Sequence, residues 1–224
     1  MVPNRFYVNI DLSHDFWLHD ADLIAQIHSA SLQVGNEVVL FDGNKQDRLY
    51  KLVELKDNEA HLQLVTDFEL KLPARKVYLL WPLLPSDQNN QLLQKCTALG
   101  VSHFMPLLAD NGEQTDFDTD SAKTLVTKSA EKGEWSVVPT VREPMHLTKA
   151  LQELTGKAEF FVCEQGEESE INPTQDHIGI LIVPINGWSQ TEAALIKSLG
   201  AQPLRLTEIG DPVSAASSCV KKIL

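Results

Sequence analysis

The chain has 224 residues, of which 43% are hydrophobic and 22% charged, a composition that excludes a disordered or collagen-like protein. Its 19 Lys and Arg residues stand against 31 Asp and Glu residues. The resulting formal charge of −12 argues against strong general nucleic-acid binding, which needs basic side chains to neutralise phosphates. No apolar run approaches the ~18 residues that span a bilayer, and three widely spaced cysteines predict no disulfide framework, so we expect a cytoplasmic protein without a membrane partner.

The first third of the chain has the pattern of short strands and a single helix. Residues 37–41 are apolar and run into the turn dipeptide Asp42-Gly43, and residues 48–55 and 60–65 alternate apolar and polar side chains. Residues 21–32 carry an apolar stripe at helical spacing. The pattern predicts a small β-barrel domain over residues 1–72.

The remainder of the chain alternates strands and helices, which predicts a second, α/β domain over residues 73–224. The strands are apolar nearly throughout, as a parallel sheet buried on both faces requires. We expect strands at residues 77–81, 103–107, 158–163, 178–183 and 203–206. We expect helices at residues 87–99, 121–132, 147–154 and 190–199, and a last helix that begins at Pro212.

Local signals fix several helix ends. Ser189 and Glu192 have the spacing of a capping box, and Asp211-Pro212 has the pattern of an N-cap followed by proline at the first helical position. Gly100 and Gly133 follow the helices predicted at residues 87–99 and 121–132, and we expect each glycine to close its helix.

Sequence motifs for common chemistry are absent. The chain contains no phosphate-binding glycine loop, no dinucleotide-binding fingerprint and no nucleophile elbow, and its histidines lack the spacing of a zinc site. We interpret Cys96, Cys163 and Cys219 as core residues, because each lies in an apolar strand or helix pattern.

One segment has a strand, a Pro/Gly turn and a capped helix in succession, over residues 182–189. Ligands bind at the carboxyl ends of strands in open α/β sheets, and a helix N-terminus there supplies free amides. The same pattern also fits an ordinary loop between a strand and a helix, so the sequence by itself leaves both interpretations open.

The order of these segments resembles one known family. The pieces are EVVLFDG at residues 37–43, LQKCTALGVSHFMP at 93–106, VPTVREPMHL at 138–147, and the strand–turn–helix at 182–189. They resemble the bacterial 16S rRNA (uracil-N3) methyltransferases, which belong to the SPOUT class of trefoil-knot methyltransferases. The resemblance implies a PUA-like β-barrel followed by a knotted SPOUT α/β domain. It also implies a homodimer, S-adenosylmethionine (SAM) as cofactor, and 16S rRNA in the small ribosomal subunit as substrate.

The resemblance also implies where the cofactor binds. It places SAM between the loops at residues 184–187 and 206–209, near Glu164, with Glu164, Pro184, Gly187 and Leu206 as the cofactor-binding residues. It implies no metal, and no residue of this chain is assigned a catalytic role.

The chain departs from the family where the chemistry lies. Val183 replaces the first glycine of the cofactor loop, and Asn111, Trp135 and Pro212 stand where the family has arginines. Ser214 stands where the family has a glutamate. Two hypotheses follow: an active SAM-dependent methyltransferase, or a catalytically inactive paralogue that serves as a binding or assembly module. The most useful single observation would be whether the pocket between the last two loops is open or is filled by Val183 and Ile185.

Overall fold

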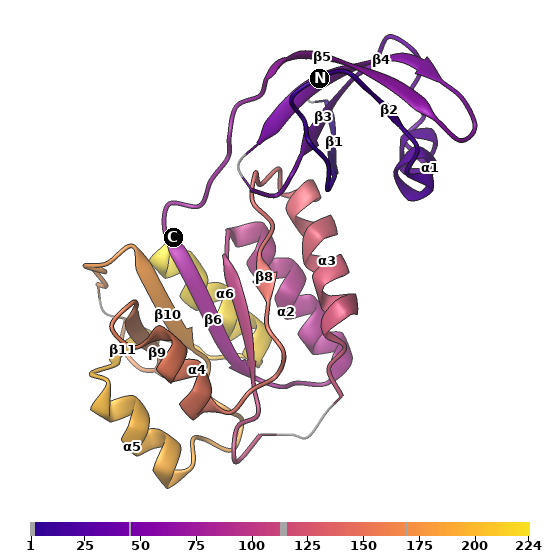
Figure 1. The fold of residues 1–224 in the computed structure, drawn as a ribbon. Coiled ribbons are helices and arrows are strands. Elements are labelled where there is room, and N and C mark those ends of the chain that lie inside the picture. The colour runs from indigo at the N-terminus through magenta and orange to yellow at the C-terminus, as the bar shows by residue number, and fades with distance from the viewer. Residues whose placement is uncertain (1–2, 45, 113–115, 169) are drawn as a thin grey trace. The chain divides into compact units, whose positions relative to one another are not determined.

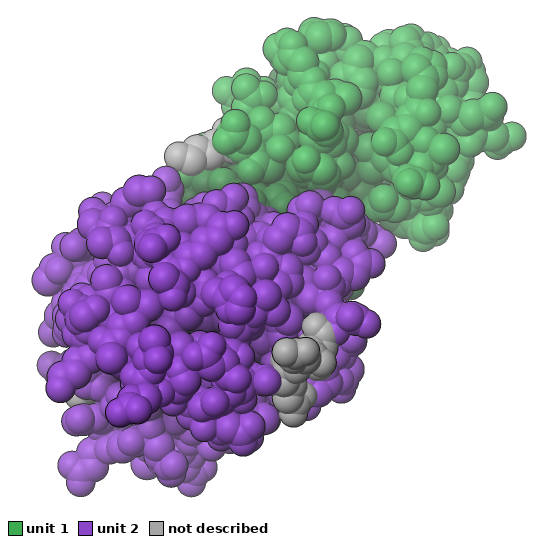
Figure 2. Space-filling view, turned by 60° about the horizontal axis from the view of Figure 1, so that its bottom comes forward, with its two compact units in different colours: residues 1–72, 130–138 green, residues 73–129, 139–224 purple. Residues whose placement is uncertain are grey.

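The computed structural model describes residues 3–44, 46–112, 116–168 and 170–224. The chain divides into two compact units, which Figure 2 colours separately. Unit 1 comprises Met1–Leu72 and Ala130–Val138, and unit 2 comprises Pro73–Ser129 and Pro139–Leu224. The chain therefore leaves unit 1 at residue 72 and returns to it for nine residues.

Unit 1 is a five-stranded sheet with one helix, α1 (Ala21–Ser29) (Figure 1). The strand order is β1-β3-β4-β5-β2, in which β1 and β3 run parallel and the other neighbours antiparallel. The strands are β1 (Asn4–Tyr7), β2 (Phe16–Leu18), β3 (Glu37–Phe41), β4 (Asp47–Leu55) and β5 (Ala60–Asp67). The apolar stripe of α1, which consists of Leu23, Ile24 and Ile27, packs into the same buried cluster as the inward-facing side chains of the strands.

Helix α1 is three residues shorter than the pattern predicts. Asp20 caps its start by accepting a hydrogen bond from the Leu23 amide. At the other end Ser31 has a left-handed φ of 56°, and the Leu32 amide donates back to the Ile27 carbonyl. This arrangement is a Schellman motif. Leu32 still packs against the core, but it does so from the cap and not from the helix.

Residues 130–138 belong to unit 1 because they bond to its strands. The Tyr7 amide in β1 donates to Glu131 Oε1 at 2.7 Å, and Val137 pairs with Asn44 in an isolated β-bridge. The Ser136 amide donates to the carbonyl of Lys71 at 2.9 Å. This segment follows a helix of unit 2 in the sequence, so no local pattern predicts its return.

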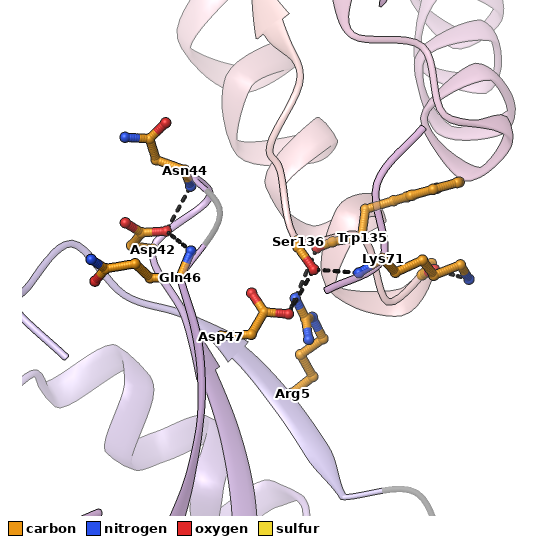
Figure 3. Close-up of polar contacts among 9 residues, drawn as sticks. Arg5, Asp42, Asn44, Gln46, Asp47, Lys71, Trp135 and Ser136 are labelled. Carbon is orange, nitrogen blue, oxygen red and sulfur yellow. Dashed lines mark hydrogen bonds and ion pairs between the residues drawn. The ribbon is translucent and has the colours of Figure 1, made fainter. Parts of the chain in front are cut away.

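A buried ion pair stands at the centre of these contacts (Figure 3). Arg5 Nη2 donates to Asp47 Oδ2 at 2.7 Å and to the Trp135 carbonyl at 3.0 Å, and the Ser136 hydroxyl donates to the same Asp47 oxygen at 2.7 Å. The side chains of Arg5 and Asp47 are 7% and 0% exposed. Two charges removed from water in this way depend on each other, because either alone would be strongly destabilising.

Unit 2 is built on a six-stranded sheet in which every pair of neighbours is parallel, as the sequence predicts. The order is β11-β9-β10-β6-β7-β8. The strands are β6 (Lys76–Pro82), β7 (His103–Leu107), β8 (Thr140–Val141), β9 (Glu159–Gln165), β10 (His177–Leu181) and β11 (Gln202–Leu206). The helices are α2 (Ser86–Leu99), α3 (Thr119–Lys132), α4 (Leu147–Leu154), α5 (Gln190–Ser198) and α6 (Pro212–Ile223).

Helices cover both faces of this sheet (Figure 1). Leu80, Leu151 and Ile196 share one buried cluster, which places α4 and α5 on the face of Leu80. Trp81 points to the opposite face, because side chains alternate along a strand, and its indole donates to Asn89 Oδ1 of α2 at 2.9 Å. Helices α2 and α6 pack against each other on that face.

Helix α3 ends at Lys132, as predicted, but its cap closes one residue beyond the predicted glycine. Glu134, and not Gly133, has the left-handed backbone, with φ of 62°. The Trp135 amide donates to the Ala130 carbonyl at 3.0 Å, and the Glu134 amide donates to Glu131 at 3.1 Å, so the cap is again a Schellman motif. A residue with a Cβ thus occupies the position that glycine adopts without strain.

Candidate cofactor site

A cavity of about 570 Å³ opens at the carboxyl ends of the parallel strands of unit 2. This is the edge at which open α/β sheets bind ligands, and the volume lies within the usual range for a ligand pocket. The cavity is lined by Cys163, Glu164, Gln165, Ile182, Val183, Pro184, Ile185, Ile209, Gly210, Pro212 and Ala215. These residues come from the ends of β9 and β10, the loop after β11, and the first turns of α6.

The lining leaves the cavity open, so Val183 and Ile185 do not fill it. Val183 packs partly against the core on the α4 and α5 face. The Ile185 side chain lies at the rim, and the residue is 72% exposed. Val183 and Ile185 therefore line the pocket without closing it.

The four residues that the resemblance proposes for the cofactor occupy different positions. Glu164 and Pro184 line the cavity. Gly187 follows one turn later, where its amide donates to the Pro184 carbonyl at 2.8 Å and its φ of 72° lets the chain reverse. Leu206 is buried at the end of β11, and its carbonyl accepts from the Gly166 amide at 3.0 Å. The structure thus brings Glu164 and Pro184 together at the cavity, whereas Gly187 and Leu206 shape its loops.

Two loops at this edge are held together by polar side chains that sequence spacing does not reveal. The Asn111 side-chain amide donates to the Gly187 carbonyl at 3.2 Å, and the Asn186 amide donates to the Asn111 carbonyl at 3.3 Å. Asn111 thereby tethers the loop after β7 to the loop at residues 184–187.

The capping box of α5 extends this tether. Ser189 Oγ accepts from the Glu192 amide, and Glu192 Oε2 accepts from the Ser189 amide, as the sequence predicts. Glu192 Oε1 also accepts from the Asp110 amide at 3.1 Å, and the Ser189 hydroxyl donates to Asp110 Oδ2 at 2.6 Å. Because Glu192 is only 6% exposed, it is a buried carboxylate satisfied by two segments that lie some 80 positions apart in the sequence.

All three cysteines are buried, which confirms their interpretation as core residues. Cys219 in α6 hydrogen-bonds to Cys163 in β9, and this bond lowers the pKa of the Cys163 thiol while raising that of Cys219. Burial raises the pKa of the Cys96 thiol to about 12. Of the three cysteines, Cys163 lines the cavity.

Helix α6 presents a closed N-terminus to the cavity. Asp211 accepts from the amides of Val213 and Ser214, at 2.9 and 3.0 Å, and Pro212 has no amide hydrogen to offer. The Ser214 hydroxyl and these amides lower the pKa of Asp211. The amides of Val213 and Ser214 at the start of α6 are therefore satisfied within the chain.

Within the described residues, no three His, Cys, Asp or Glu side chains gather closely enough to hold a metal ion. Across the same residues, none of the helices has the length and apolar character needed to cross a membrane.

The fold defines the class of this protein. Unit 1 and unit 2 correspond to the PUA-like barrel and the SPOUT-type α/β domain, as two solved structures match nearly the whole chain. A ribosomal RNA small subunit methyltransferase E from Neisseria gonorrhoeae, crystallised bound to S-adenosyl methionine, has a TM-score of 0.87 at 18% identity, with 98% of this chain and 96% of that one covered. A Legionella pneumophila protein described as a methyltransferase, in complex with SAM, has a TM-score of 0.83 at 16% identity, with 99% and 96% covered.

The sequence shows the family. The model of the RNA methyltransferase domain matches residues 71–209, and the chain belongs to that family. Among characterised proteins, Ribosomal RNA small subunit methyltransferase E from Synechocystis is 24% identical over 196 residues, which cover 81% of this chain. The aligned part spans 64% of that relative's length.

Proposed function

We propose that the protein is a SAM-dependent methyltransferase that acts on N3 of a uridine in 16S rRNA of the small ribosomal subunit. The observation that carries the proposal is the open cavity at the carboxyl edge of the unit 2 sheet, in a chain that belongs to the RNA methyltransferase domain family. The SAM-bound state of two proteins of the same fold supports the same cofactor here.

The lining of the cavity fits SAM in size and in charge. A volume of about 570 Å³ accommodates a nucleoside with an amino-acid tail, and the walls mix apolar side chains with backbone polar groups. SAM supplies a methyl group on a positively charged sulfonium. Glu164, at the end of β9, has an exposed carboxylate and lines this cavity. Its negative charge would favour a cation there.

The chain's own residues would bind and position the cofactor. Pro184 and the Gly187 turn would shape the wall against which the nucleoside packs, and Asn111 would hold that wall in place through the Gly187 carbonyl. Methylation at N3 also requires removal of the uridine N3 proton, which a positioned base and nearby cations promote. No residue is assigned as that base.

Binding of SAM tests the first half of the proposal. Isothermal titration of the intact protein with SAM should show one site per chain. Glu164→Gln should raise the dissociation constant about tenfold through loss of the carboxylate. Glu167→Gln removes an equal charge from an exposed residue outside the lining and should leave the constant within twofold. An absence of binding by the wild-type protein would refute the proposal.

Methyl transfer tests the second half. Small ribosomal subunits incubated with the protein and methyl-labelled SAM should contain labelled N3-methyluridine by mass spectrometry of the digested rRNA. SAM binding without any label in the rRNA would favour the alternative, a catalytically inactive paralogue that serves as a binding or assembly module. This alternative is tested because the chain lacks the arginines and the glutamate of the family at four positions: Asn111, Trp135, Pro212 and Ser214.

The proposal includes an assembly state and a location. As the family resemblance implies, we infer a homodimer with a trefoil knot in the C-terminal part of unit 2, working in the cytoplasm where ribosomal subunits are found. Sedimentation equilibrium should give twice the mass of the 25.0 kDa chain. A monomer at micromolar concentration would contradict the dimer.

A further inference from the structure

A second cavity, of about 480 Å³, lies at the opposite end of the unit 2 sheet from the cofactor cavity. Its lining includes Tyr78, His103 and Thr140, which stand near the amino ends of β6, β7 and β8. Tyr78 pairs in register with His103, and His103 pairs with Thr140, so the three side chains form a row across the strands. We call this row, together with Arg142, Lys157 and the nearby Lys76 of β6, the amino-end surface.

Two of the three side chains in the row are stacked rings. The Tyr78 and His103 rings lie 4.3 Å apart between centroids and are 15° from parallel. His177, from the neighbouring strand β10, lies 6.0 Å from Tyr78 on the other side, and the Tyr78 hydroxyl hydrogen-bonds to its Nδ1 at 3.4 Å. His103 Nδ1 in turn bonds to Thr140 Oγ1 at 2.7 Å. The rings are thereby held in one orientation, and both Tyr78 and His103 are only partly buried.

Three basic side chains lie near the rings. Arg142 and Lys157 line the cavity, and Lys76 precedes Tyr78 by two residues on the same face of β6. Burial and the positive charges of Lys76, His177 and Arg142 lower the pKa of His103 to about 4, so its ring is neutral at pH 7. The carboxylate in the lining belongs to Glu153, which pairs with Arg142. Among the described residues, neither Lys76 nor Lys157 forms an ion pair.

This concentration of positive charge stands out in a chain with a net charge of −12. Flat rings against which a base can stack, beside cations that can meet a phosphate, are the two elements with which proteins bind single-stranded nucleic acid. Neither element is part of the cofactor cavity, and the cation–ring cluster has no role in the mechanism proposed above.

We propose that the amino-end surface binds a single-stranded segment of the substrate RNA, with a base against the Tyr78–His103 rings and the backbone phosphates at Lys76, Arg142 and Lys157. The inference rests on the proposed function for the kind of polymer that binds. It explains how an acidic protein can hold RNA, since a local cluster of cations is sufficient where the overall charge is repulsive.

Charge-removing variants of the intact protein test the phosphate contacts. The probe is a fluorescein-labelled, single-stranded RNA of 20 nucleotides with mixed sequence. Lys76→Gln/Lys157→Gln should weaken binding about tenfold and reduce the slope of log K against log salt by about 1.4, since each phosphate contact to a single strand contributes about 0.7. The matched control, Lys95→Gln/Lys128→Gln, removes the same charge from exposed positions on α2 and α3 and should bind within twofold of the wild-type protein.

A ring-removing variant tests the stacking. His103→Ala should weaken binding about tenfold without a change in the salt slope, because the neutral ring contributes through stacking and not through charge. Circular dichroism confirms that each variant is folded before its affinity is compared.

Three results would overturn the inference: no RNA binding by the wild-type protein, equal binding by the two double variants, or a changed sedimentation mass for Lys76→Gln/Lys157→Gln. The last result would mark the surface as a contact between subunits. SAM titration separates this failure from that of the proposed function. Suppose that SAM binding and methyl transfer are normal and that the two double variants bind RNA equally well. That result refutes only the amino-end surface. Suppose instead that the wild-type protein binds no SAM, and that Lys76→Gln/Lys157→Gln loses RNA binding. That result refutes only the proposed function.

Discussion

At the residue scale, Asp47 holds two buried partners of unit 1 in place, Arg5 and Ser136. Asp47→Ala leaves the Arg5 guanidinium buried without its carboxylate and the Ser136 hydroxyl without its acceptor. We expect a loss of about 3–5 kcal/mol in the free energy of unfolding, measured by urea denaturation. Asp67→Ala breaks an ion pair with Arg48 in which the Asp67 side chain is 81% exposed, and it should cost less than about 1 kcal/mol. Equal losses in the two variants would contradict this assignment.

A substitution at Glu134 is expected to stabilise the protein. Its left-handed backbone favours glycine, so Glu134→Gly should raise the free energy of unfolding by up to about 1 kcal/mol. Gly156 supplies the converse case, because it has φ of 73° and a Cβ built on it would meet no atom within 4 Å. Gly156→Ala should therefore lower stability by about 1 kcal/mol through backbone conformation alone. Thermal unfolding of both variants checks the pair.

His103 makes stability depend on pH. Its pKa is lowered to about 4 in the folded protein, against about 6.5 in the unfolded chain, so the unfolded chain takes up this proton first as the pH falls. Stability should therefore decrease between pH 6.5 and 4. His103→Gln should make this decrease shallower by about 1–2 kcal/mol, a value that allows for partial exposure to solvent.

At the scale of elements, Glu192 joins the start of α5 to the loop after β7. Glu192→Ala removes the acceptor of the Ser189 and Asp110 amides and should cost about 2–3 kcal/mol. It should also weaken SAM binding several-fold, because the start of α5, which directly follows the loop at residues 184–187, loses its bond to the Asp110 amide. Asp118→Ala removes a cap at the start of α3 whose hydrogen bonds are all local, to Asp120 and Ser121. It should lower stability by about 1 kcal/mol and leave SAM binding unchanged in calorimetry.

The elements also differ in how well local sequence predicts them. Helix α4 has the bounds that its apolar stripe predicts, and the caps at Ser189 and Asp211 form as their residue types indicate. Helix α1 ends three residues early and the cap of α3 falls one residue beyond Gly133, because Ser31 and Glu134 adopt left-handed conformations that neither residue type favours. In both cases the reversal brings the next apolar residue, Leu32 or Trp135, back toward its own unit, and that packing is not visible in the local sequence.

At the scale of the whole molecule, residues 130–138 should unfold with the N-terminal strands of unit 1. Native-state hydrogen exchange can show this, since the amides of Ser136 and Val138 are bonded to Lys71 and Gly43. In Asp47→Ala both amides should exchange at least tenfold faster, while amides of β6 in unit 2 keep their wild-type rates. Equal acceleration in β6 would contradict the independence of the two units.

The sequence by itself determined the kinds of elements, the parallel sheet and the family. Apolar periodicity and capping residues are local properties, and the motif order over residues 93–106 and 182–189 survives in the chain. Only the tertiary structure decided which distant side chains meet. The cavity beside Glu164 and Pro184 is open, Asn111 tethers the cofactor loop, and residues 130–138 return to unit 1. These features depend on contacts between segments that lie tens of residues apart in the sequence. Local sequence patterns do not predict such contacts.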